Sequence, residues 1–312
     1  MAKRKTSRKF FSLKLDRKTK KKLIIALGVV LAFSIFLFFL SRFQPHRRRF
    51  FQKPKGKIAR SSGARVSAPP RLKPRVWPVP YRQLPPRVFG PGPKIAFVID
   101  DIGNRAEHST LLRALGDQVT YSILPFVRHS RYFDELSRQT GADVILHLPL
   151  ESLKGTIPGP GLITTQMSDQ AVLELLNRDL ASVPHAIGAN NHMGSKGTSD
   201  PHLMRLILSE LKKRNLFFLD SKTSSRSVAA GMSGELGMPV LKRDIFLDNE
   251  AQQDAIRNEI REASGIAQKR GYAVAIGHYR YSTLEVLLEE IPRLRREGYQ
   301  VVGLEDLLRE RR

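Results

Sequence analysis

Two adjacent aspartates, Asp100 and Asp101, follow the apolar run of residues 95–99. Such a run is typical of a buried β-strand, so the pair is expected at a strand's carboxyl end, where barrel enzymes carry their active sites. Neighbouring carboxylates do not both ionise freely unless a positive group, usually a metal ion, holds one of them. The pair therefore predicts a metal-binding carboxylate beside a proton acceptor. The alternative is a solvated turn in which an aspartate caps a helix.

Further acids and imidazoles stand where other short apolar runs end. They are His147, Glu151, His192, Asp220, Asp244, Asp248, His278 and Glu305. A single strand-end histidine is more often a hydrogen-bonded core residue than a ligand. Several at equivalent positions of one barrel, however, converge on one mouth and predict a single polar site there.

The residue types at this mouth suit metal-assisted hydrolysis. One carboxylate and two neutral imidazoles can hold Zn²⁺ or a similar divalent ion and leave a position open for water. Asp101, His147 and His192 are the predicted ligands. Such an ion lowers the pKa of bound water toward about 7, and two further groups then move the protons. Asp100 and His278 suit those two roles.

A metal phosphoesterase is an alternative use of the same mouth. It would need a richer carboxylate cluster or a second metal ion about 4 Å from the first. Asp244 and Asp248 are the acids that could supply it.

From Lys94 onward, short apolar runs alternate with patterns of 3.6-residue spacing. The expected strands are residues 95–99, 119–124, 144–148, 186–189, 216–219, 240–246, 273–276 and 301–304, and the expected helices are 169–180, 202–214, 250–268 and 283–296. The expected helix N-caps are Ser168, Asp200 and Ser282, and the glycines expected to follow helices are Gly141, Gly271 and Gly298. Seven or eight such units predict an α/β fold, a distorted (β/α)7–8 barrel.

Positive charge is concentrated in residues 1–94, which carry 26 lysines and arginines and one acid. Residues 95–312 carry 27 against 28, so the net charge of +24 lies outside the predicted barrel. A nucleic-acid reader needs its cations on a folded face or groove. We therefore predict no nucleic-acid partner. The absence of cysteine fits an oxidising compartment without requiring one.

The cations flank residues 23–40, an apolar run of 18 residues without an ionisable group. As a helix this run would span roughly 27 Å, enough for a membrane's hydrocarbon core. Eleven lysines and arginines lie in residues 1–22 and eight in residues 41–60, which favours a cytoplasmic N-terminus. No small-residue cleavage site follows, so an uncleaved signal anchor in the inner membrane is expected, with the C-terminal domain periplasmic or otherwise extracytoplasmic.

The predicted organisation has four parts. They are a basic cytoplasmic tail at 1–22, a transmembrane signal anchor at 23–40, a disordered linker at 41–93 and the barrel domain at 94–312. The linker is rich in proline, arginine and lysine, and such a segment cannot bury enough apolar surface to fold.

Six short motifs carry a family resemblance. They are Val-Ile-Asp-Asp at 98–101, His-Leu-Pro-Leu-Glu at 147–151, Asn-His-Met-Gly-Ser at 191–195, Phe-Leu-Asp-Ser at 218–221, Arg-Asp-Ile-Phe-Leu-Asp at 243–248, and Gly-His at 277–278 followed by Thr283. Together, and in this order over residues 94–310, they resemble the divergent polysaccharide deacetylases. This family is a branch of the NodB-like carbohydrate esterase superfamily, whose fold is a distorted seven-stranded βα barrel.

The resemblance implies metal-dependent hydrolysis of N-acetyl groups on an amino-sugar polymer, with peptidoglycan or another envelope glycan as the partner. It implies that Asp100 is the catalytic base, that Asp101 binds the metal and that His278 protonates the leaving amine. Typical members of the wider superfamily carry a second metal-binding histidine four residues after the first. Here Glu151 has that place. Either His192 supplies the second imidazole or Glu151 itself binds the metal.

Several residues have two interpretations each. Asp220, Arg243 and Asp244 are candidates to orient the base and the ligands, or to form a structural ion pair at the mouth. Tyr279 is a candidate to stack on a sugar, or a packing aromatic. Glu151 also supports a different function, a catalytically silent domain that keeps the metal pocket for glycan binding or as a scaffold in the cell envelope.

Overall fold

The structure is a computed structural model that describes residues 90–309. The predicted basic tail, the predicted transmembrane segment and nearly all of the predicted linker lie outside the described residues. Within residues 90–309, no helix is long and apolar enough to cross a membrane.

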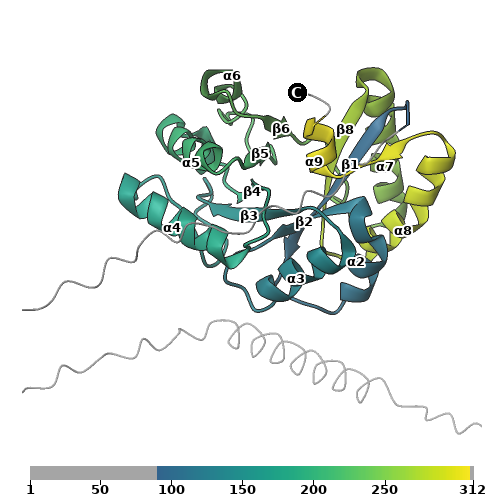
Figure 1. Ribbon diagram of the computed structural model, residues 1–312, viewed down its shortest axis with the longest axis horizontal. Helices are drawn as coiled ribbons and strands as arrows, with labels where there is room; N and C mark the ends of the chain where they lie inside the picture. The colour runs from purple at the N-terminus through teal and green to yellow at the C-terminus, as the bar shows by residue number, and fades with distance from the viewer. Residues whose placement is uncertain (1–89, 310–312) are drawn as a thin grey trace, which may run out of the picture. The chain divides into compact units, whose positions relative to one another are not determined.

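Nine parallel strands form one strongly curved sheet (Figure 1). They are β1 (Lys94–Ile102), β2 (Val119–Ile123), β3 (Val144–Leu150), β4 (Gly188–Met193), β5 (Phe217–Asp220), β6 (Val240–Lys242), β7 (Ile245–Phe246), β8 (Tyr272–His278) and β9 (Gln300–Val301). Their order is β6-β5-β4-β3-β2-β1-β8-β7, and β9 pairs with β1. β6 and β7 are consecutive in the chain but end opposite sides of this order. The parallel α/β fold is therefore confirmed, as a curled half-barrel.

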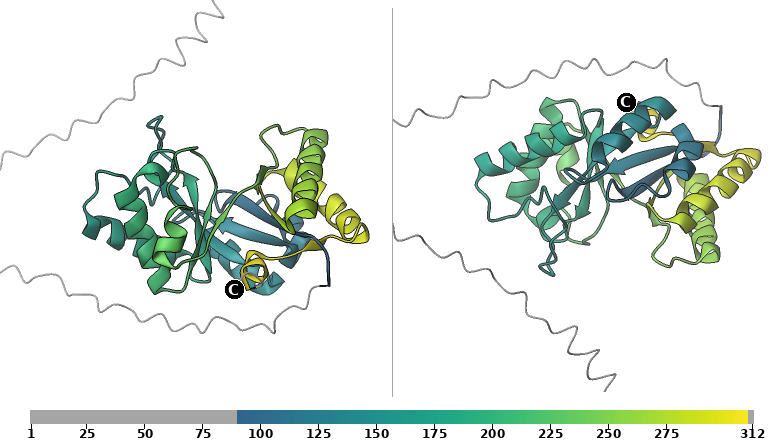
Figure 2. Two further views of the ribbon diagram at one scale, coloured as in Figure 1. Left: turned by 90° about the horizontal axis from the view of Figure 1, so that it is seen from above. Right: turned by 90° about the horizontal axis from the view of Figure 1, so that it is seen from below.

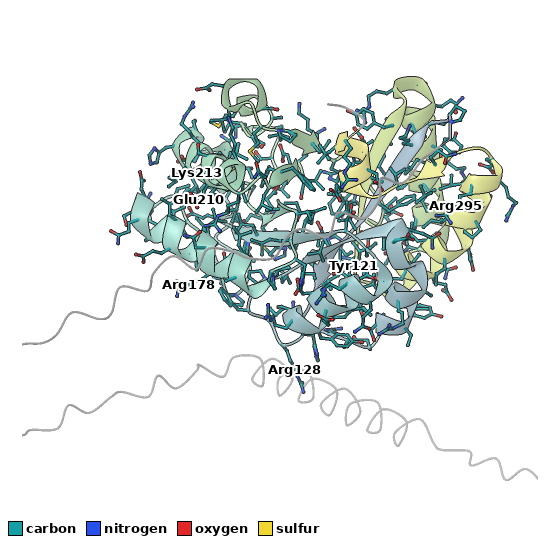
Figure 3. The ribbon with its side chains drawn as sticks, viewed as in Figure 1. Tyr121, Arg128, Arg178, Glu210, Lys213 and Arg295 are labelled. Carbon is teal, nitrogen blue, oxygen red and sulfur yellow. The ribbon has the colours of Figure 1, made fainter. Side chains whose placement is uncertain are left out.

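Helices connect most of the strands along the outer side of the sheet (Figure 2). They are α2 (Ser109–Leu115), α3 (Ser130–Thr140), α4 (Asp169–Ser182), α5 (Pro201–Lys213), α6 (Met232–Leu236), α7 (Gln253–Arg270), α8 (Tyr281–Arg296) and α9 (Leu304–Arg309). The teal and green α4 and α5 lie at one end of the sheet, and α7 and α8 at the other. Arg178 and Arg295 project outward from these helices, whereas Tyr121 lies inside the fold (Figure 3).

The alternation of β1 separates two cores. Its outward residues Ile95, Phe97 and Ile99 pack in the large cluster that includes the apolar faces of the outer helices. Its inward residues Ala96 and Val98 pack in a second cluster with leucines of α9. Because strand side chains alternate with period two, the next inward position is an aspartate, Asp100. The polar site thus begins where the apolar filling of the barrel interior ends.

Two of the three predicted helix caps are confirmed. The Ser168 hydroxyl accepts a hydrogen bond from the backbone N–H of Ala171 at 3.3 Å, and an Asp200 carboxylate oxygen accepts one from Leu203 at 2.9 Å. The prediction for Ser282 is wrong, because this serine is already the second residue of α8.

Two predicted strands differ from the structure. Residues 240–246 are not one strand, because β6 pairs with β5 whereas β7 pairs with β8. The chain crosses from one end of the sheet to the other at Arg243 and Asp244. The strand predicted at 301–304 is also wrong beyond Val301, because Leu304 already begins α9. Its apolar residues fill the barrel interior as a helix, and a short apolar run alone does not distinguish the two.

Candidate metal and catalytic site

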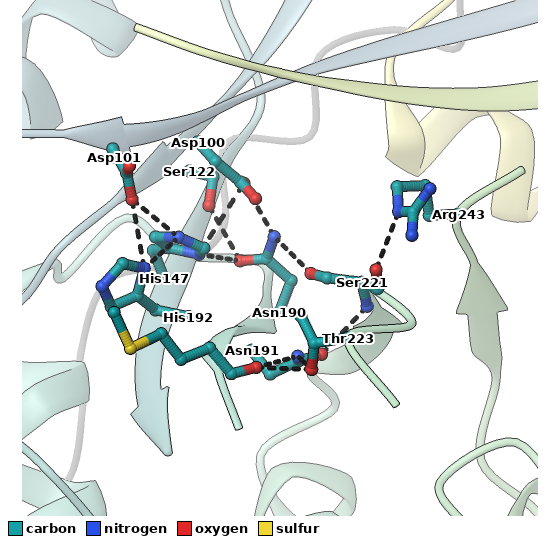
Figure 4. A network of polar contacts seen from close by, with 11 residues as sticks. Asp100, Asp101, Ser122, His147, Asn190, Asn191, His192, Ser221, Thr223 and Arg243 are labelled. Atoms are coloured by element: carbon teal, nitrogen blue, oxygen red, sulfur yellow. Dashed lines mark hydrogen bonds and ion pairs between the residues drawn. The ribbon is translucent and has the colours of Figure 1, made fainter. Parts of the chain in front are cut away.

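The three predicted ligands meet in space (Figure 4): Asp101 and His192 lie near the carboxyl ends of β1 and β4, and His147 lies in the middle of β3. Asp101 Oδ1 lies 3.2 Å from His147 Nε2 and 3.1 Å from His192 Nδ1, and the two nitrogens are 3.0 Å apart. Atoms bound to one zinc ion at about 2.0–2.1 Å in tetrahedral geometry stand roughly 3.3 Å from one another. The near-equilateral triangle therefore fits a single divalent ion.

Asp101 is held in a conformation that few residues adopt. Its φ is 63°, in the left-handed region that side chains disfavour, and Met193, which follows His192, has a φ of 54°. Asp101 Oδ1 is buried and has no hydrogen-bond partner among the described residues, although both imidazoles lie close to it. Strained backbone and an unsatisfied buried oxygen are costly, and a cation bound between the three ligand atoms would satisfy that oxygen.

The electrostatics of the triangle favour a bound cation. Burial raises the pKa of the Asp101 carboxyl, but the two neighbouring imidazoles lower it by more and keep it well below its usual range. Burial lowers the pKa of His147, whereas the Asp100 charge and the contact with Asp101 raise it to about 9. The pocket thus stabilises positive charge, and a divalent ion would supply that charge in place of the proton.

A buried asparagine, Asn190, joins the triangle to the predicted base. Its Nδ2 donates to Asp100 Oδ1 at 2.8 Å and to Ser221 Oγ at 3.2 Å. Its Oδ1 accepts from Ser122 Oγ at 2.8 Å and lies 2.8 Å from His147 Nδ1. Asn190 is not among the site residues predicted from the sequence. Its place two positions before a predicted ligand, on the same face of a strand, was the available signal.

Asp100 lies beside the triangle, on the inward face of β1. The side chain is almost wholly buried, and Oδ1 is 3.7 Å from His147 Nδ1 as well as bonded to Asn190. Among the residues at 90–309, no hydrogen bond to Asp100 Oδ2 is found. One oxygen is thus fixed by the protein, and the other can accept a proton.

His278 ends β8 opposite Asp100, its register partner on β1. Its Nδ1 is 2.8 Å from Asp248 Oδ1, and Asp248 Oδ2 accepts hydrogen bonds from the His278 backbone at 2.8 Å and from Thr283 Oγ1 at 2.7 Å. Burial lowers the pKa of His278, but the hydrogen bond and charge of Asp248 raise it above its ordinary value. The pair therefore favours a protonated imidazole whose Nε2 is the atom left to donate.

Glu151 lies outside the triangle. Its Oε1 forms an ion pair with Lys196 Nζ at 2.8 Å, and its Oε2 accepts from the backbone N–H and the hydroxyl of Thr165 at 2.9 and 2.7 Å. In this structure the second imidazole beside His147 comes from His192, and the Glu151 carboxylate instead links two loops of the rim.

Asp220 and Arg243 do not form an ion pair with each other. The Asp220 carboxylate accepts the backbone N–H of Lys222 at 2.8 Å. Arg243 Nε donates to the Ser221 carbonyl oxygen at 2.7 Å, and its guanidinium stacks 4.6 Å above the centre of the Phe246 ring. Both residues thus hold the end of β5 and its loop, which carries the serine bonded to Asn190.

Asp244 does not reach the site, contrary to the expectation that it orients site residues. It forms an ion pair with Arg270 and accepts the backbone N–H of Val274 at 2.9 Å, near the amino end of β8. Asp248 is engaged by His278 near the carboxyl end of the same strand. The two acids therefore form no second metal cluster, and the phosphoesterase interpretation loses its basis.

Tyr279 is a packing aromatic in this structure. Its hydroxyl accepts the backbone N–H of His108 at 3.1 Å, and its ring lies edge-on to Phe133, with the ring centres 5.4 Å apart. These contacts tie the loop after β8 to α2 and α3 and use the side chain for packing.

A cavity of about 290 Å³ lies on the same rim as the triangle. Its lining comes from the loops after β3, β4 and β5 and from the start of α5: Leu153, Thr165, Lys196, Ser199, Asp200, Pro201 and Arg226. Two of these strands also carry His147 and His192. The cavity therefore lies beside the loops that follow these strands, and none of the three predicted ligands lines it.

The chain is similar to known proteins in sequence. The family model for divergent polysaccharide deacetylases matches residues 97–308. An uncharacterized protein of Haemophilus influenzae is 34% identical over 219 residues, which are 69% of this chain and 77% of that protein. The uncharacterized protein YibQ of Escherichia coli K12 is 32% identical over 198 residues, 64% of this chain and 62% of that protein.

Among solved structures, an uncharacterized protein of Agrobacterium tumefaciens C58 has the same fold. Its TM-score is 0.69 at 22% sequence identity, over 71% of this chain and 92% of that one. Since the family model spans well over half of the sequence, the chain belongs to the divergent polysaccharide deacetylases.

Proposed function

We propose that this protein hydrolyses N-acetyl groups of an amino-sugar polymer of the cell envelope, with one divalent ion, favoured as Zn²⁺, held by Asp101, His147 and His192. The observation that carries the proposal is the triangle of three ligand atoms 3.0–3.2 Å apart, directly beside Asp100. Membership of the family supports the class of reaction. When bound, such an ion polarises the acetyl carbonyl and lowers the pKa of a water molecule.

Asp100 is the proposed base. Asn190 fixes one of its carboxylate oxygens, which leaves Oδ2 to accept the proton of the attacking water. The water oxygen then bonds to the acetyl carbon. A general base in this position typically contributes 10²–10⁴-fold to the rate.

His278 is the proposed acid. As the carbon–nitrogen bond breaks, its Nε2 donates a proton to the departing amine, and acetate is the other product. Asp248 holds Nδ1 at 2.8 Å and stabilises the imidazolium before the transfer. The two proton transfers balance the addition of one water molecule across the amide.

The main alternative, a silent domain that binds glycan or acts as a scaffold, depended on Glu151. The Glu151 carboxylate is engaged by Lys196 and Thr165, and three ligands meet without it. The ligand set does not need Glu151, and we therefore prefer hydrolysis.

Acetate release tests the choice. The full-length protein loaded with Zn²⁺ should release acetate from N-acetylated chitooligosaccharides or from peptidoglycan fragments. The Asp100→Asn variant should keep its zinc and lose the release. A wild-type protein that binds stoichiometric zinc and glycan without releasing acetate would favour the silent alternative.

We also propose, from the sequence, that residues 23–40 anchor the protein in the inner membrane and that the barrel domain is periplasmic. Residues 1–22 would then lie in the cytoplasm. Protease added to intact spheroplasts should digest the C-terminal domain. Protection until the spheroplasts are lysed would overturn this orientation.

A further inference from the structure

We propose that Asn190 is a positioning residue that fixes which nitrogen of His147 is free to bind the metal and, with the same amide, orients Asp100. The inference rests on the proposed metal-dependent function and goes beyond the ligands and the base. Asn190 is completely buried at the centre of the network in Figure 4, and four polar groups surround its amide.

The orientation of the amide follows from its partners. The Asn190 Nδ2 donates to Asp100 Oδ1 at 2.8 Å, and this carboxylate oxygen is the acceptor that the amide N–H needs. Oδ1 then faces His147 Nδ1 at 2.8 Å. A carbonyl oxygen only accepts, so this nitrogen carries the proton. The serines on either side can donate or accept, and they adapt to this arrangement.

The consequence is a defined ligand atom. With the proton on Nδ1, Nε2 is the His147 nitrogen left to bind the metal, and it lies 3.2 Å from Asp101 Oδ1. His192 faces the triangle with its other nitrogen, Nδ1, 3.1 Å from the same oxygen. The structure thus assigns opposite tautomers to the two imidazoles in the metal-bound protein.

An amide is the side chain that suits this place. It carries a donor and an acceptor on one rigid group, so it satisfies a histidine N–H and a carboxylate together. A carboxylate at position 190 would still accept from His147, but it could not donate to Asp100 and would set a second negative charge beside it. A methyl group would leave both partners unpaired in a buried site, which is costly.

Zinc affinity of full-length variants, measured by competition with a chromophoric chelator, tests the first half of the proposal. Asn190→Ala should weaken zinc binding by about 10–100-fold, the usual effect of losing the partner that orients a metal-binding histidine. Asn190→Asp should stay within about threefold of wild type, because the acceptor for His147 remains. If both variants bind zinc as wild type does, the proposal is wrong.

Asn191 provides the matched control. It is the next residue on β4 and equally buried, but its side chain bonds to the Met193 carbonyl oxygen, the Thr223 hydroxyl and the Ser221 backbone N–H. Asn191→Ala should therefore keep wild-type zinc affinity. An equal loss in Asn190→Ala and Asn191→Ala would show that β4 is merely disrupted, and would overturn the proposal.

The tautomers can be observed directly by NMR of the zinc-loaded protein labelled with ¹⁵N-histidine. Wild type should show one zinc-bound imidazole with a slowly exchanging Nδ1–H, lost in His147→Gln, and a second with its proton on Nε2. Asn190→Asp should retain the first signal. If circular dichroism shows that Asn190→Ala does not fold, the wild-type and Asn190→Asp spectra still test whether His147 carries its proton on Nδ1. Two zinc-bound imidazoles of the same tautomer would refute the proposal.

Acetate release tests the second half of the proposal, that Asn190 orients Asp100. Asn190→Asp should lose on the order of 10²-fold or more in turnover at full zinc occupancy, because Asp100 loses its donor and gains a like charge. Wild-type turnover in this variant would show that Asn190 does not orient Asp100 for catalysis. A wild-type protein with the predicted zinc affinities and tautomers but no acetate release would contradict the proposed function and leave the His147 assignment standing.

Discussion

Two aspartates carry buried carboxylate oxygens without a hydrogen-bond partner among the described residues, and their electrostatics are opposite. At the barrel mouth, the neighbouring imidazoles keep the pKa of Asp101 far below its usual range despite burial. On the buried face of α4, burial raises the pKa of Asp179 to about 8, opposed only by the charge of Arg178. A buried negative charge is thus retained at the mouth, where a cation can bind, and suppressed in the outer layer.

The surroundings explain the difference. Asp179 faces the rim loop, where a Cβ added to Gly161 would lie 2.7 Å from its Oδ1 and 2.8 Å from Pro125. Arg178 points outward from α4 (Figure 3). No imidazole or ammonium is found among the contacts of Asp179 within residues 90–309. It therefore behaves as a neutral packing group, whereas Asp101 behaves as a ligand.

The largest effect should come from Asp101→Asn. Asp101 is itself a proposed ligand. Removing its charge should therefore weaken zinc binding by at least about 100-fold, which exceeds the usual effect of removing a residue that only hydrogen-bonds to a ligand. Inductively coupled plasma mass spectrometry of the purified protein measures it. Asp179→Asn is the matched control and should keep its zinc. Full zinc occupancy in Asp101→Asn would erase the contrast between the two aspartates.

The site residues with charge or imidazole could be selected from the sequence because they recur where apolar runs end. Asp100, Asp101, His147 and His192 are such cases, and the structure brings them together. Asn190 carries neither a charge nor an imidazole, so this pattern does not select it. Only its place two residues before His192 marks it in the sequence, and its importance lies in four contacts with other strands and with the loop after β5.

The other differences between the sequence prediction and the structure arise from contacts between segments that are distant in the sequence. Asp244 and Asp248 lie four residues apart in one motif, but the chain crosses the open side of the barrel there, and only Asp248 reaches His278. The parallel α/β fold was predictable from alternating runs, because its strands are buried on both faces. The short apolar run after Val301 predicts a strand as readily as a helix. The helix α9 is favoured only once the barrel has folded, because its leucines then fill the barrel interior.

A third buried aspartate, Asp248, differs from both Asp101 and Asp179. Its carboxylate pairs with the single imidazole of His278 and lies outside the triangle. Asp248→Asn should spare zinc and lower turnover at neutral pH on the order of 10²-fold or more. Asp248 raises the pKa of His278, and an acid catalyst is lost as pH rises through its pKa. The alkaline limb of the kcat profile should therefore move to lower pH in the variant. An unchanged profile would exclude His278 as the acid.

Asp179→Asn tests whether the Asp179 carboxyl is neutral in the folded protein. The native carboxyl, with a pKa of about 8, binds its proton more tightly than the unfolded chain does, with a pKa near about 3.9. Stability from the protonated form is complete below about pH 4 and declines as the pH rises toward 8. Asparagine stays neutral, so the variant should match wild type near pH 4 and exceed it by several kcal/mol, on the order of 5, at pH 8.

Urea unfolding of the zinc-free proteins at a series of pH values measures this difference. The same series on Asp101→Asn should show no such gain at alkaline pH, because the native Asp101 is already ionised and its pKa is lowered. A stability gap in Asp179→Asn that does not grow with pH would show that its carboxyl is charged in the folded protein, and the two aspartates would then be alike.

The smallest effect should come from Glu151→Gln. The Glu151 carboxylate already has an ammonium partner and two donors from Thr165, so it has none of the unsatisfied character of Asp101. Zinc affinity should be unchanged, and stability should fall by at most about 1 kcal/mol, as expected for a partly exposed ion pair. Lys196→Met, which removes the partner, should match it in both respects. A clear loss of zinc in Glu151→Gln but not in Lys196→Met would mean that Glu151 turns inward to bind the ion. The carboxylate four residues after His147 would then be a ligand after all, and the triangle would be incomplete without it.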